Sequence, residues 1–389
     1  MRSVAVIGAS LAGLYAARAL RDQGFDGTLT IVGSERHRPY DRPPLSKEFL
    51  AGRMTEADLA LETDDEDLAA EWRLGVRASG LDPRDRRVLL ADGTSIAADG
   101  VVVATGATAR TLPGDSPTLE GVHTLRTLDD ASALRADLVP GRRLVVIGAG
   151  FIGAEVASTA CELGLGVTIV ETAPAPLARA LGGEMGTALG ALHEERGVGL
   201  ICGVAVQALT GGDRVDGVLL ADGQRLDADV VLVGIGARPE IGWLEGSGVE
   251  LGDGVLCDSG GGTSLPGVVA VGDCAAWFDP GLGRHHRVEH WTGAVQRPAA
   301  ATATLLSGGS APAPPQAPPY LWSDQYGMRI QFAGHTLPGD TVTVEEGDVA
   351  ARSFLAVYRR EDRPVAVLGV DQVRQFTRWR RRLATVNTG

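Results

Sequence analysis

Apolar and polar positions in the first part of the chain follow a pattern that predicts a strand, a turn, a helix and a second strand. The apolar run 4–7 leads into a glycine-containing turn, after which Leu14, Ala17 and Leu20 recur at helical spacing. The apolar run 29–32 follows. Short apolar runs are typical of parallel strands buried on both faces, whereas apolar residues three apart mark one side of a helix.

The same pattern returns later in the chain. The apolar run 144–147 leads into a second glycine-rich turn, a helical segment follows, and the apolar run 167–170 completes the unit. We therefore expect two copies of one strand–turn–helix–strand unit in this protein.

The first turn has the spacing of a Rossmann dinucleotide-binding motif. Gly8 permits the tight turn, the position of Ser10 lets backbone approach a pyrophosphate, and Gly13 lets helix and strand pack closely. The helix N-terminus then presents N–H groups and partial positive charge to the phosphates. Glu35 follows the second strand and can accept hydrogen bonds from ribose hydroxyls. Ser10 stands where glycine is usual, which weakens the match slightly because serine is small.

The second turn carries all three glycines, Gly148, Gly150 and Gly153, and its second strand ends at Glu171. One such motif is weak evidence because glycine-rich turns also arise by chance. Two motifs, each after an apolar strand and each followed by an acid, predict two bound dinucleotides. The natural pair is FAD and a nicotinamide cofactor.

Two further strands favour flavin at the first turn. The apolar run 101–103 ends in Ala104, Thr105 and Gly106, and the run 268–271 ends in Gly272 and Asp273. An aspartate at this point can hydrogen-bond the ribityl chain of a flavin. The alternative, an acid that caps a turn or a helix, is less favoured beside the two motifs.

Three longer segments, 40–47, 287–291 and 319–327, carry a more specific resemblance. With the glycine motifs, they make the chain resemble the NADH-dependent ferredoxin reductases of bacterial oxygenase and cytochrome P450 systems. These are flavoproteins with two dinucleotide-binding domains, within the pyridine nucleotide-disulfide oxidoreductase superfamily. The match runs in order over nearly the whole chain.

The resemblance implies an α/β fold with two Rossmann-like domains, as in glutathione reductase, and a small α+β C-terminal domain. The predicted domains are an FAD domain over 1–113 and 246–316, an NADH domain over 114–245 and a C-terminal domain over 320–389. Smaller expectations are a hairpin over 215–226, a Pro- and Ala-rich linker over 310–319, C-terminal strands at 329–332 and 365–368, and a final helix over 371–383.

The resemblance also implies roles for individual side chains. Lys47 would lie near the isoalloxazine and Trp291 beside the flavin, Glu289 and Trp322 would lie where the nicotinamide arrives, and Glu155 would help to place NADH. The predicted catalytic residues are Lys47, Glu289 and Trp322. The predicted cofactor-binding set is Gly8, Ser10, Leu11, Ala12, Gly13, Glu35, Arg42, Lys47, Ala104, Thr105, Gly106, Arg110, Gly272, Asp273, Glu289, His290, Trp291, Ala294 and Trp322, with Gly148, Gly150, Phe151, Ile152, Gly153, Glu155, Glu171, Arg179 and Gly236.

Chemistry supports part of this assignment without the resemblance. Positive charge from Lys47 would stabilise a reduced flavin anion, and tryptophan beside a flavin shields it from water. Ordinary alternatives are a solvated surface position for Lys47 and a core position for Trp322. Glu171 favours NADH over NADPH because a carboxylate binds the free 2′-hydroxyl and repels a 2′-phosphate. No basic residue follows it before Arg179.

Composition narrows the function classes. The net charge of −13 argues against a generic nucleic-acid role. No apolar run approaches the roughly 20 residues that span a bilayer, and the first residues lack the features of a signal peptide, so we expect a cytoplasmic protein without membrane association. The four cysteines form no CxxC pair, which argues against a disulfide framework, a metal site or a dithiol centre. Each is expected to be a small buried side chain.

The expected reaction is hydride transfer from NADH to FAD, followed by release of single electrons to an acidic ferredoxin. A basic face would favour that docking, and the candidates are Arg284, Arg287, Arg329 and the cluster 378–382, although the cluster also fits a solvated helix face. Reductases of rubredoxin or of nitrite reductase would share these motifs, as would apoptosis-inducing flavoproteins that act through partner binding. A disulfide reductase or a flavin hydroxylase fits less well. The chain is expected to be a monomer or a homodimer.

Overall fold

The computed structural model describes residues 1–113, 119–309 and 317–386. Most of the predicted linker, 310–316, lies outside the described residues. The chain forms two compact units, each built from separated segments. Unit 1 comprises Met1–Asp41, Ala60–Thr108 and Arg238–Pro319, and unit 2 comprises Arg42–Leu59, Ala109–Ala237 and Tyr320–Gly389. The units differ from the three predicted domains in two main ways. Residues 42–59, expected with the FAD domain, belong to unit 2, and the predicted C-terminal domain 320–389 falls in the same unit as most of the predicted NADH domain.

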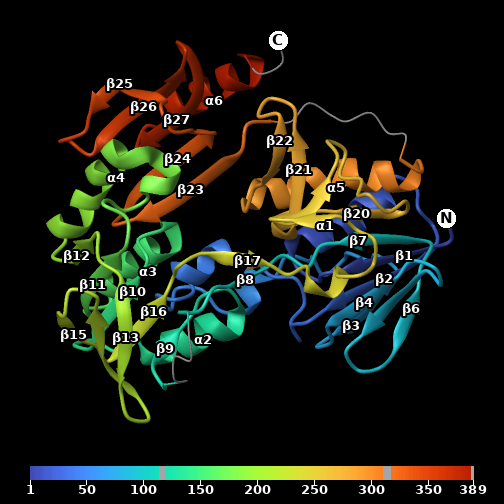
Figure 1. The fold of residues 1–389 in the computed structure, drawn as a ribbon, viewed down its shortest axis with the longest axis horizontal. Coiled ribbons are helices and arrows are strands. Elements are labelled where there is room, and N and C mark those ends of the chain that lie inside the picture. The colour runs from blue at the N-terminus through green and yellow to red at the C-terminus, as the bar shows by residue number, and fades with distance from the viewer. Residues whose placement is uncertain (114–118, 310–316, 387–389) are drawn as a thin grey trace. The chain divides into compact units, whose positions relative to one another are not determined.

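Unit 1 is built on a five-stranded parallel sheet in the order β20-β7-β1-β2-β3. Two helices, α1 and α5, pack against each other beside it (Figure 1). These elements are β1 (Ser3–Ile7), α1 (Leu11–Asp22), β2 (Thr28–Gly33), β3 (Ala70–Leu74), β7 (Gly100–Val103), β20 (Val268–Ala270) and α5 (Trp291–Leu306). The two apolar runs predicted as strands at 4–7 and 29–32 are therefore neighbouring strands.

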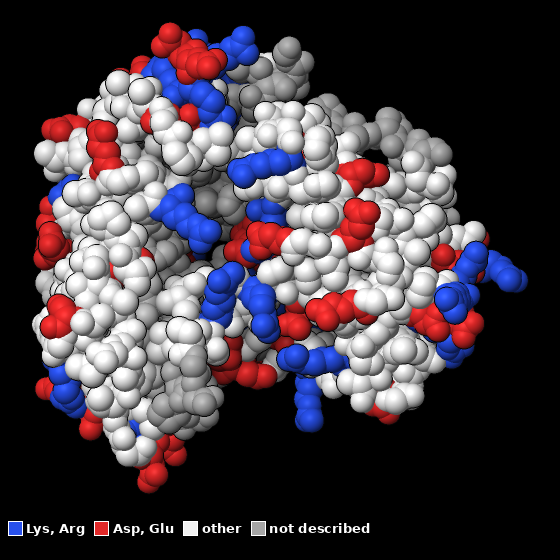
Figure 2. Space-filling model, in the orientation of Figure 1, with Lys and Arg blue, Asp and Glu red and all other residues white. Residues whose placement is uncertain are grey.

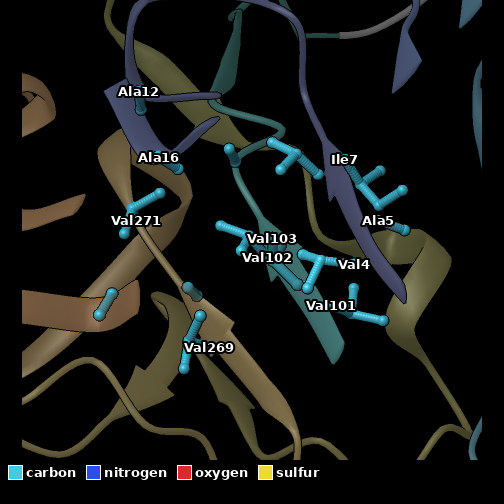
Figure 3. Packing of buried hydrophobic residues seen from close by; sticks show 14 of the residues in the cluster. Val4, Ala5, Ile7, Ala12, Ala16, Val101, Val102, Val103, Val269 and Val271 are labelled. Carbon is cyan, nitrogen blue, oxygen red and sulfur yellow. The ribbon is translucent and has the colours of Figure 1, made fainter. Parts of the chain in front are cut away.

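The core of unit 1 lies between this sheet and its helices. Figure 3 shows valines of β7 beside side chains of β1, with Ala12 and Ala16 of α1 nearby. The four residues of β7 are all buried, as are the last four of β1. Continuous burial explains why these strands are continuous apolar runs and do not alternate with polar residues.

Smaller sheets complete unit 1. The strands β4, β5 and β6 form one antiparallel sheet, and β18, β19, β21 and β22 form a mixed sheet in which β19 and β21 pair in parallel. Their bounds are β4 (Ala78–Asp82), β5 (Arg87–Leu90), β6 (Ser95–Ala97), β18 (Leu251–Gly252), β19 (Gly254–Cys257), β21 (Ala275–Asp279) and β22 (Arg284–Arg287), with short helices η3 (Gly242–Leu244) and η4 (Gly272–Cys274). The paired strands β8 (Ala107–Ala109) and β17 (Ala237–Pro239) each contain a unit boundary.

Unit 2 repeats the architecture with a parallel sheet in the order β12-β11-β10-β16-β9. Its elements are η1 (Pro43–Ser46), η2 (Ala57–Leu59), β9 (Val122–His123), α2 (Leu128–Asp137), β10 (Arg143–Ile147), α3 (Phe151–Glu162), β11 (Gly166–Glu171), α4 (Ala178–Glu195), β12 (Gly199–Cys202), β13 (Val206–Gly211), β14 (Val215–Leu220), β15 (Arg225–Asp227) and β16 (Val230–Val233). The predicted hairpin at 215–226 is found as β14 paired with β15, and β13 extends it to a three-stranded sheet.

The C-terminal segment of unit 2 is an antiparallel sheet in the order β23-β24-β27-β26-β25, followed by α6. These elements are β23 (Tyr320–Gln325), β24 (Met328–Gly334), β25 (Thr341–Asp348), β26 (Ser353–Arg360), β27 (Arg363–Val370) and α6 (Val373–Val386). Both predicted strands are present, but the helix begins two residues later than expected. Asp371 has a φ of 49° and its carboxylate accepts the N–H of Arg329 at 2.7 Å, so it closes the sheet and is not helical.

The expectation that every cysteine is buried is wrong for two of the four. Cys257 and Cys274 are buried, whereas Cys161 and Cys202 are partly exposed, and all four are free. Burial raises the pKa of Cys274, which keeps that thiol protonated and unreactive. No helix in the described part of the chain has the length and apolar character that a membrane crossing requires.

Candidate functional site

In unit 1 the first glycine turn is fixed by close packing of backbone. Gly8 has a φ of +126°, and a Cβ there would overlap the carbonyl oxygen of Ala104. A Cβ on Gly13 would overlap the carbonyl oxygen of Gly8. Gly272 has a φ of +74°, and a Cβ on it would lie 2.8 Å from Cβ of Ala12. The structure therefore brings the first motif, Ala104 and Gly272 together around the N-terminus of α1, where backbone N–H groups favour an anion.

Side chains on the same side of unit 1 are held by specific hydrogen bonds. The hydroxyl of Tyr40 donates to Glu35 at 2.5 Å, and Nε1 of Trp291 donates to Asp41 at 2.8 Å. Sequence analysis assigned no role to Tyr40 or Asp41. Both bonds orient predicted cofactor residues, since Glu35 lies two residues past the end of β2 and Trp291 begins α5.

The residue before Trp291 is His290. Its Nδ1 atom is enclosed, and no described residue provides it with a hydrogen-bond partner. Burial lowers the pKa of His290 to about 4, so the ring is neutral near pH 7. An enclosed polar atom of this kind fits a bound group that supplies the missing partner. Glu289, the next residue back, pairs with Arg287.

The second glycine turn, in unit 2, reproduces the geometry of the first. Gly148 has a φ of +103°, and a Cβ there would overlap the carbonyl oxygen of Gly234. A Cβ on Gly153 would overlap the carbonyl oxygen of Gly148, whereas a Cβ on Gly150 would meet nothing within 4 Å. The turn therefore leaves open space at Gly150, where a ligand can approach the backbone closely.

The carboxylate of Glu171 is held against the second turn. It accepts the backbone N–H of Ala149 at 2.8 Å and that of Ala173 at 2.8 Å. The hydroxyl of Thr172 also donates to it at 3.1 Å. A carboxylate has about four lone-pair sites, so these three donors leave capacity for a ribose hydroxyl. The acid that sequence analysis selected as the determinant of NADH preference is thereby fixed beside the glycines.

A buried polar network lies beside the second turn. Glu155, in the first half of α3, is 3% exposed and Lys47 is 8% exposed. Nζ of Lys47 lies 3.2 Å from Oε1 of Glu155, and the hydroxyl of Ser46 donates to Oε2 at 2.5 Å. Because Lys47 is buried, its alternative assignment as a solvated surface lysine is wrong.

The C-terminal segment completes this network from β23. The hydroxyl of Ser323 donates to Oε1 of Glu155 at 2.7 Å, and Nε2 of Gln325 donates to that hydroxyl at 3.0 Å. Three donors thus converge on one carboxylate, an arrangement that suits its ionised form. Trp322, between these strand positions, is partly exposed and stacks on Tyr320 with ring centroids 5.9 Å apart.

The predicted catalytic residues divide between the units. Lys47 and Trp322 lie in unit 2, and Glu289 lies in unit 1. Other predicted residues also have defined surroundings. The guanidinium of Arg42 donates to the carbonyl of Arg126, and the N–H of Arg110 donates to Gly236 at 2.9 Å. In unit 1, the hydroxyl of Thr105 donates to the carbonyl of Glu240 at 2.6 Å.

Sequence analysis missed Ser46, Ser323 and Gln325 as members of the network. One signal was available, because 321, 323 and 325 share a face of a strand and two of these positions are polar. Polar residues on a face that packs against another element need partners. The partners come from segments that are far apart in the sequence, so residue spacing could not predict which side chains form the network.

Two protein-family models match the chain. The model described as pyridine nucleotide-disulphide oxidoreductase matches residues 2–297, and the model described as reductase C-terminal matches residues 320–388. Together they cover both glycine turns and the C-terminal sheet.

Curated relatives match over nearly the full length of the chain. The ferredoxin reductase component of chlorobenzene dioxygenase from Cupriavidus sp. (strain PS12) is 40% identical, over 96% of this chain and 90% of its own length. The ferredoxin–NAD(+) reductase component of the biphenyl dioxygenase system from Paraburkholderia xenovorans (strain LB400) is 38% identical, over 96% and 91%.

The fold also matches a solved structure. The covalent complex of putidaredoxin reductase with putidaredoxin contains a chain that superposes with a TM-score of 0.93 at 32% identity. The match covers 98% of this chain and 93% of that one. These similarities confirm the predicted α/β fold class, with two Rossmann-like domains and a C-terminal α+β segment.

Proposed function

The chain belongs to the pyridine nucleotide-disulphide oxidoreductase family, and on that premise we propose that it is an NADH-dependent ferredoxin reductase of an oxygenase or cytochrome P450 system. The observation that carries the proposal is the presence, in one chain, of two dinucleotide turns of matching geometry and a buried Lys47–Glu155 pair. The reaction would take place in the cytoplasm, where NADH is available.

FAD fits the first turn on the chain's own geometry. Gly8 and Gly13 are required by close backbone packing, Gly272 approaches α1, and Nδ1 of His290 lacks a partner among the described residues. We assign FAD binding to the predicted residues around this turn, within a domain formed by 1–113 and 246–316. Arg42 would hold the phosphates and Asp273 the ribityl chain. When bound, FAD accepts two electrons from NADH and releases them one at a time.

NADH fits the second turn for related reasons. Gly150 leaves open space at the turn, and the carboxylate of Glu171 is held beside it by two backbone N–H groups. A fixed carboxylate accepts hydrogen bonds from the adenosine ribose and repels the 2′-phosphate of NADPH. We therefore propose NADH as the preferred donor, bound by the domain at 114–245.

The buried pair supplies the charge that the reaction needs. Lys47 would stabilise negative charge that develops on the reduced flavin, and Glu155 holds the ammonium group in place. Ser46 and Ser323 fix the carboxylate on its other sides. Trp322 and Glu289 would border the nicotinamide, and Trp322 would exclude water from the reacting atoms.

Anaerobic stopped-flow mixing of the purified yellow protein with NADH, and separately with NADPH, tests the proposal. We expect rapid bleaching of the flavin band by NADH and little bleaching by NADPH. Addition of a ferredoxin with cytochrome c as the final acceptor should then give NADH-dependent cytochrome reduction. A flavin that neither nucleotide bleaches would contradict the assignment of the second turn.

The docking face for an acidic carrier is proposed on α6. Of the predicted basic candidates, Arg287 pairs with Glu289, Arg329 with Asp324 and Arg378 with Glu346. Arg381 and Arg382, on the same helix as Arg378, also have exposed side chains. Figure 2 shows acidic and basic side chains interspersed over the face in view, so attraction of an acidic carrier would come from a small group of arginines.

Reversal of the arginines at 380–382 to glutamate should slow ferredoxin reduction at low salt while NADH bleaching of the flavin is unchanged. Electrostatic steering is screened by salt, so the difference should shrink as ionic strength rises. A matched control reverses Arg84, Arg86 and Arg87 in unit 1, three exposed arginines whose reversal changes the net charge equally. If both charge reversals slow ferredoxin reduction equally, the proposal of a specific docking face on α6 is wrong.

A further inference from the structure

The helix α4 contains a break close to its start. Gly182 has φ 78° and ψ 164°, which are not helical values, and Leu177, before the first helical residue, has a φ of 53°. A short helical turn, 178–181, is thereby separated from the main part of α4. Arg179, a predicted cofactor residue, lies in that turn and is exposed.

Two carbonyl groups beside the break accept hydrogen bonds from side chains of the C-terminal segment. The hydroxyl of Thr336 donates to the carbonyl of Ala180 at 3.0 Å. The hydroxyl of Tyr358, in β26, donates to the carbonyl of Leu181 at 2.8 Å. Tyr358 is 3% exposed, and burial raises its pKa, so this hydroxyl stays protonated and remains a donor.

The short turn is connected in the other direction to the second glycine motif. The N–H of Leu177 donates to the carbonyl of Ala149 at 3.1 Å, while the N–H of Ala149 donates to Glu171 at 2.8 Å. Ala149 lies between the first two glycines of the motif. Both of its backbone polar groups are thus held by the segment that links β11 to α4. Packing tightens this segment, because a Cβ on Gly186 would overlap the carbonyl oxygen of Pro176.

We propose that Thr336 and Tyr358 are positioning residues for the adenosine half of NADH. They hold the short turn, the turn holds Ala149 through Leu177, and Ala149 is part of the loop that receives the dinucleotide. A site that is already ordered binds more tightly because less conformational entropy is lost on binding. The inference rests on the proposed function, since it takes the second turn as the NADH site.

The test uses the FAD-loaded protein with Tyr358→Phe, Thr336→Val and the double substitution. Both changes keep shape and remove a single hydroxyl. ADP-ribose, which contains the adenosine half of NADH and no nicotinamide, is titrated by calorimetry. One neutral hydrogen bond corresponds to a change in Kd of roughly three- to ten-fold, so we expect a weaker Kd by that factor in each single variant. The NADH concentration for half-maximal flavin bleaching should rise by the same factor, with an unchanged limiting rate.

Thr341→Val provides a matched control, because it removes a hydroxyl from the same sheet that points to the carbonyl of Arg359 in a neighbouring strand. It should leave the Kd for ADP-ribose unchanged. A lower melting temperature in Tyr358→Phe and Thr336→Val, with wild-type affinity, would overturn the inference and leave a purely structural role. A fall in the limiting bleaching rate without a change in the Kd for ADP-ribose would also overturn it. If Tyr358→Phe fails to fold, Thr336→Val alone decides, since Thr336 is only partly buried. Failure of the wild-type protein to bind ADP-ribose would overturn the proposed NADH site itself, and this inference with it.

Discussion

The two glycine turns agree at two positions and differ at the third. In both turns the first glycine has a positive φ, and a Cβ on it would overlap a carbonyl oxygen of a neighbouring strand end. In both turns the last glycine lies against the carbonyl oxygen of the first. The middle position is Ser10 in unit 1 and Gly150 in unit 2. Ser10 has φ −118° and Gly150 has φ −76°, so neither needs the freedom of glycine.

The difference separates two kinds of requirement. The first and last glycines are fixed by packing within the protein, which admits no side chain. The middle position is limited only by what approaches the turn, because no protein atom lies within 4 Å of a Cβ on Gly150. Ser10 is therefore compatible with the fold, and the two turns can bind their dinucleotides at different distances from the backbone.

The units also differ two residues beyond the last glycine. Unit 1 has Tyr15 at this position, and the guanidinium carbon of Arg18 lies 5.0 Å from the centroid of its ring. Unit 2 has Glu155, which is buried and receives Lys47, Ser46 and Ser323. The second turn therefore has a buried charged network beside it that the first turn lacks at the matching position, in keeping with the proposed role of Lys47 in the reaction.

The largest effects are expected from alanine at the first glycine of each turn. Gly8→Ala and Gly148→Ala each force a Cβ onto a carbonyl oxygen at a positive φ, which should destabilise the affected unit by about 4 kcal/mol or more. Gly8→Ala should yield colourless protein. Gly148→Ala should retain yellow flavin that NADH no longer bleaches. The ratio of flavin to protein absorbance and the bleaching amplitude measure the two outcomes.

These variants also test whether the turns are independent. Alanine at Gly166, which would meet nothing within 4 Å and has no positive φ, is the control for a glycine substitution in the same sheet at the end away from the turn. Loss of flavin from Gly148→Ala would show that the second turn is also needed for FAD binding, contrary to the assignment of one cofactor to each turn.

The next effect concerns the contrast between Glu155 and Tyr15. Glu155→Gln leaves the buried ammonium of Lys47 without its counter-charge, and removal of one partner from a buried ion pair costs about 3 kcal/mol. We expect lower stability in urea unfolding and a more than ten-fold slower bleaching by NADH. Tyr15→Phe, at the matching position of unit 1, should change neither value by much. If Tyr15→Phe lowers stability and slows bleaching as much as Glu155→Gln does, the proposed difference between the two turns is wrong.

Acid should destabilise both units through one buried histidine in each. His193 in unit 2 is 2% exposed, and burial lowers its pKa from 6.5 to about 4. The unfolded chain then binds more protons than the folded one between these values, so stability is lost as pH falls from about 6.5 towards 4. The loss amounts to roughly 2 kcal/mol at pH 5. Burial lowers the pKa of His290 in unit 1 to about 4 as well, so its contribution should be of similar size.

Urea unfolding of the wild type, His193→Gln and His290→Gln at pH 7.5 and pH 5 measures both contributions. Each variant should lose less stability on acidification than the wild type. The exposed His285 supplies the control substitution. An acid sensitivity that is the same in His193→Gln and the wild type would show that other groups determine it.

Much of each unit was predictable because the apolar runs that form its strands and the glycines that form its turn are close together in the sequence. The strands around 4–7 and 144–147 are continuous apolar runs, and the glycines between strand and helix have no sterically acceptable replacement at two of three positions. The polar network was not predictable, because Ser46, Glu155 and Ser323 are far apart in the chain and meet only after folding. The contact of Tyr358 was not predictable either, because no periodicity in the sequence reveals the break in α4 or the carbonyl group to which the Tyr358 hydroxyl donates.

The smallest expected effect is the most direct test of the comparison, an exchange of the middle residues. Gly150→Ser should fold normally, with a free energy of unfolding within about 1 kcal/mol of the wild type, because its side chain enters open space. It should weaken NADH binding several-fold, since that space is where the dinucleotide approaches. Ser10→Gly should cost a few tenths of a kcal/mol in unfolding free energy through added backbone freedom and should leave flavin content unchanged. If Gly150→Ser instead loses stability and keeps its affinity for NADH, the middle glycine is required by the protein, and the division between packing and ligand requirements fails.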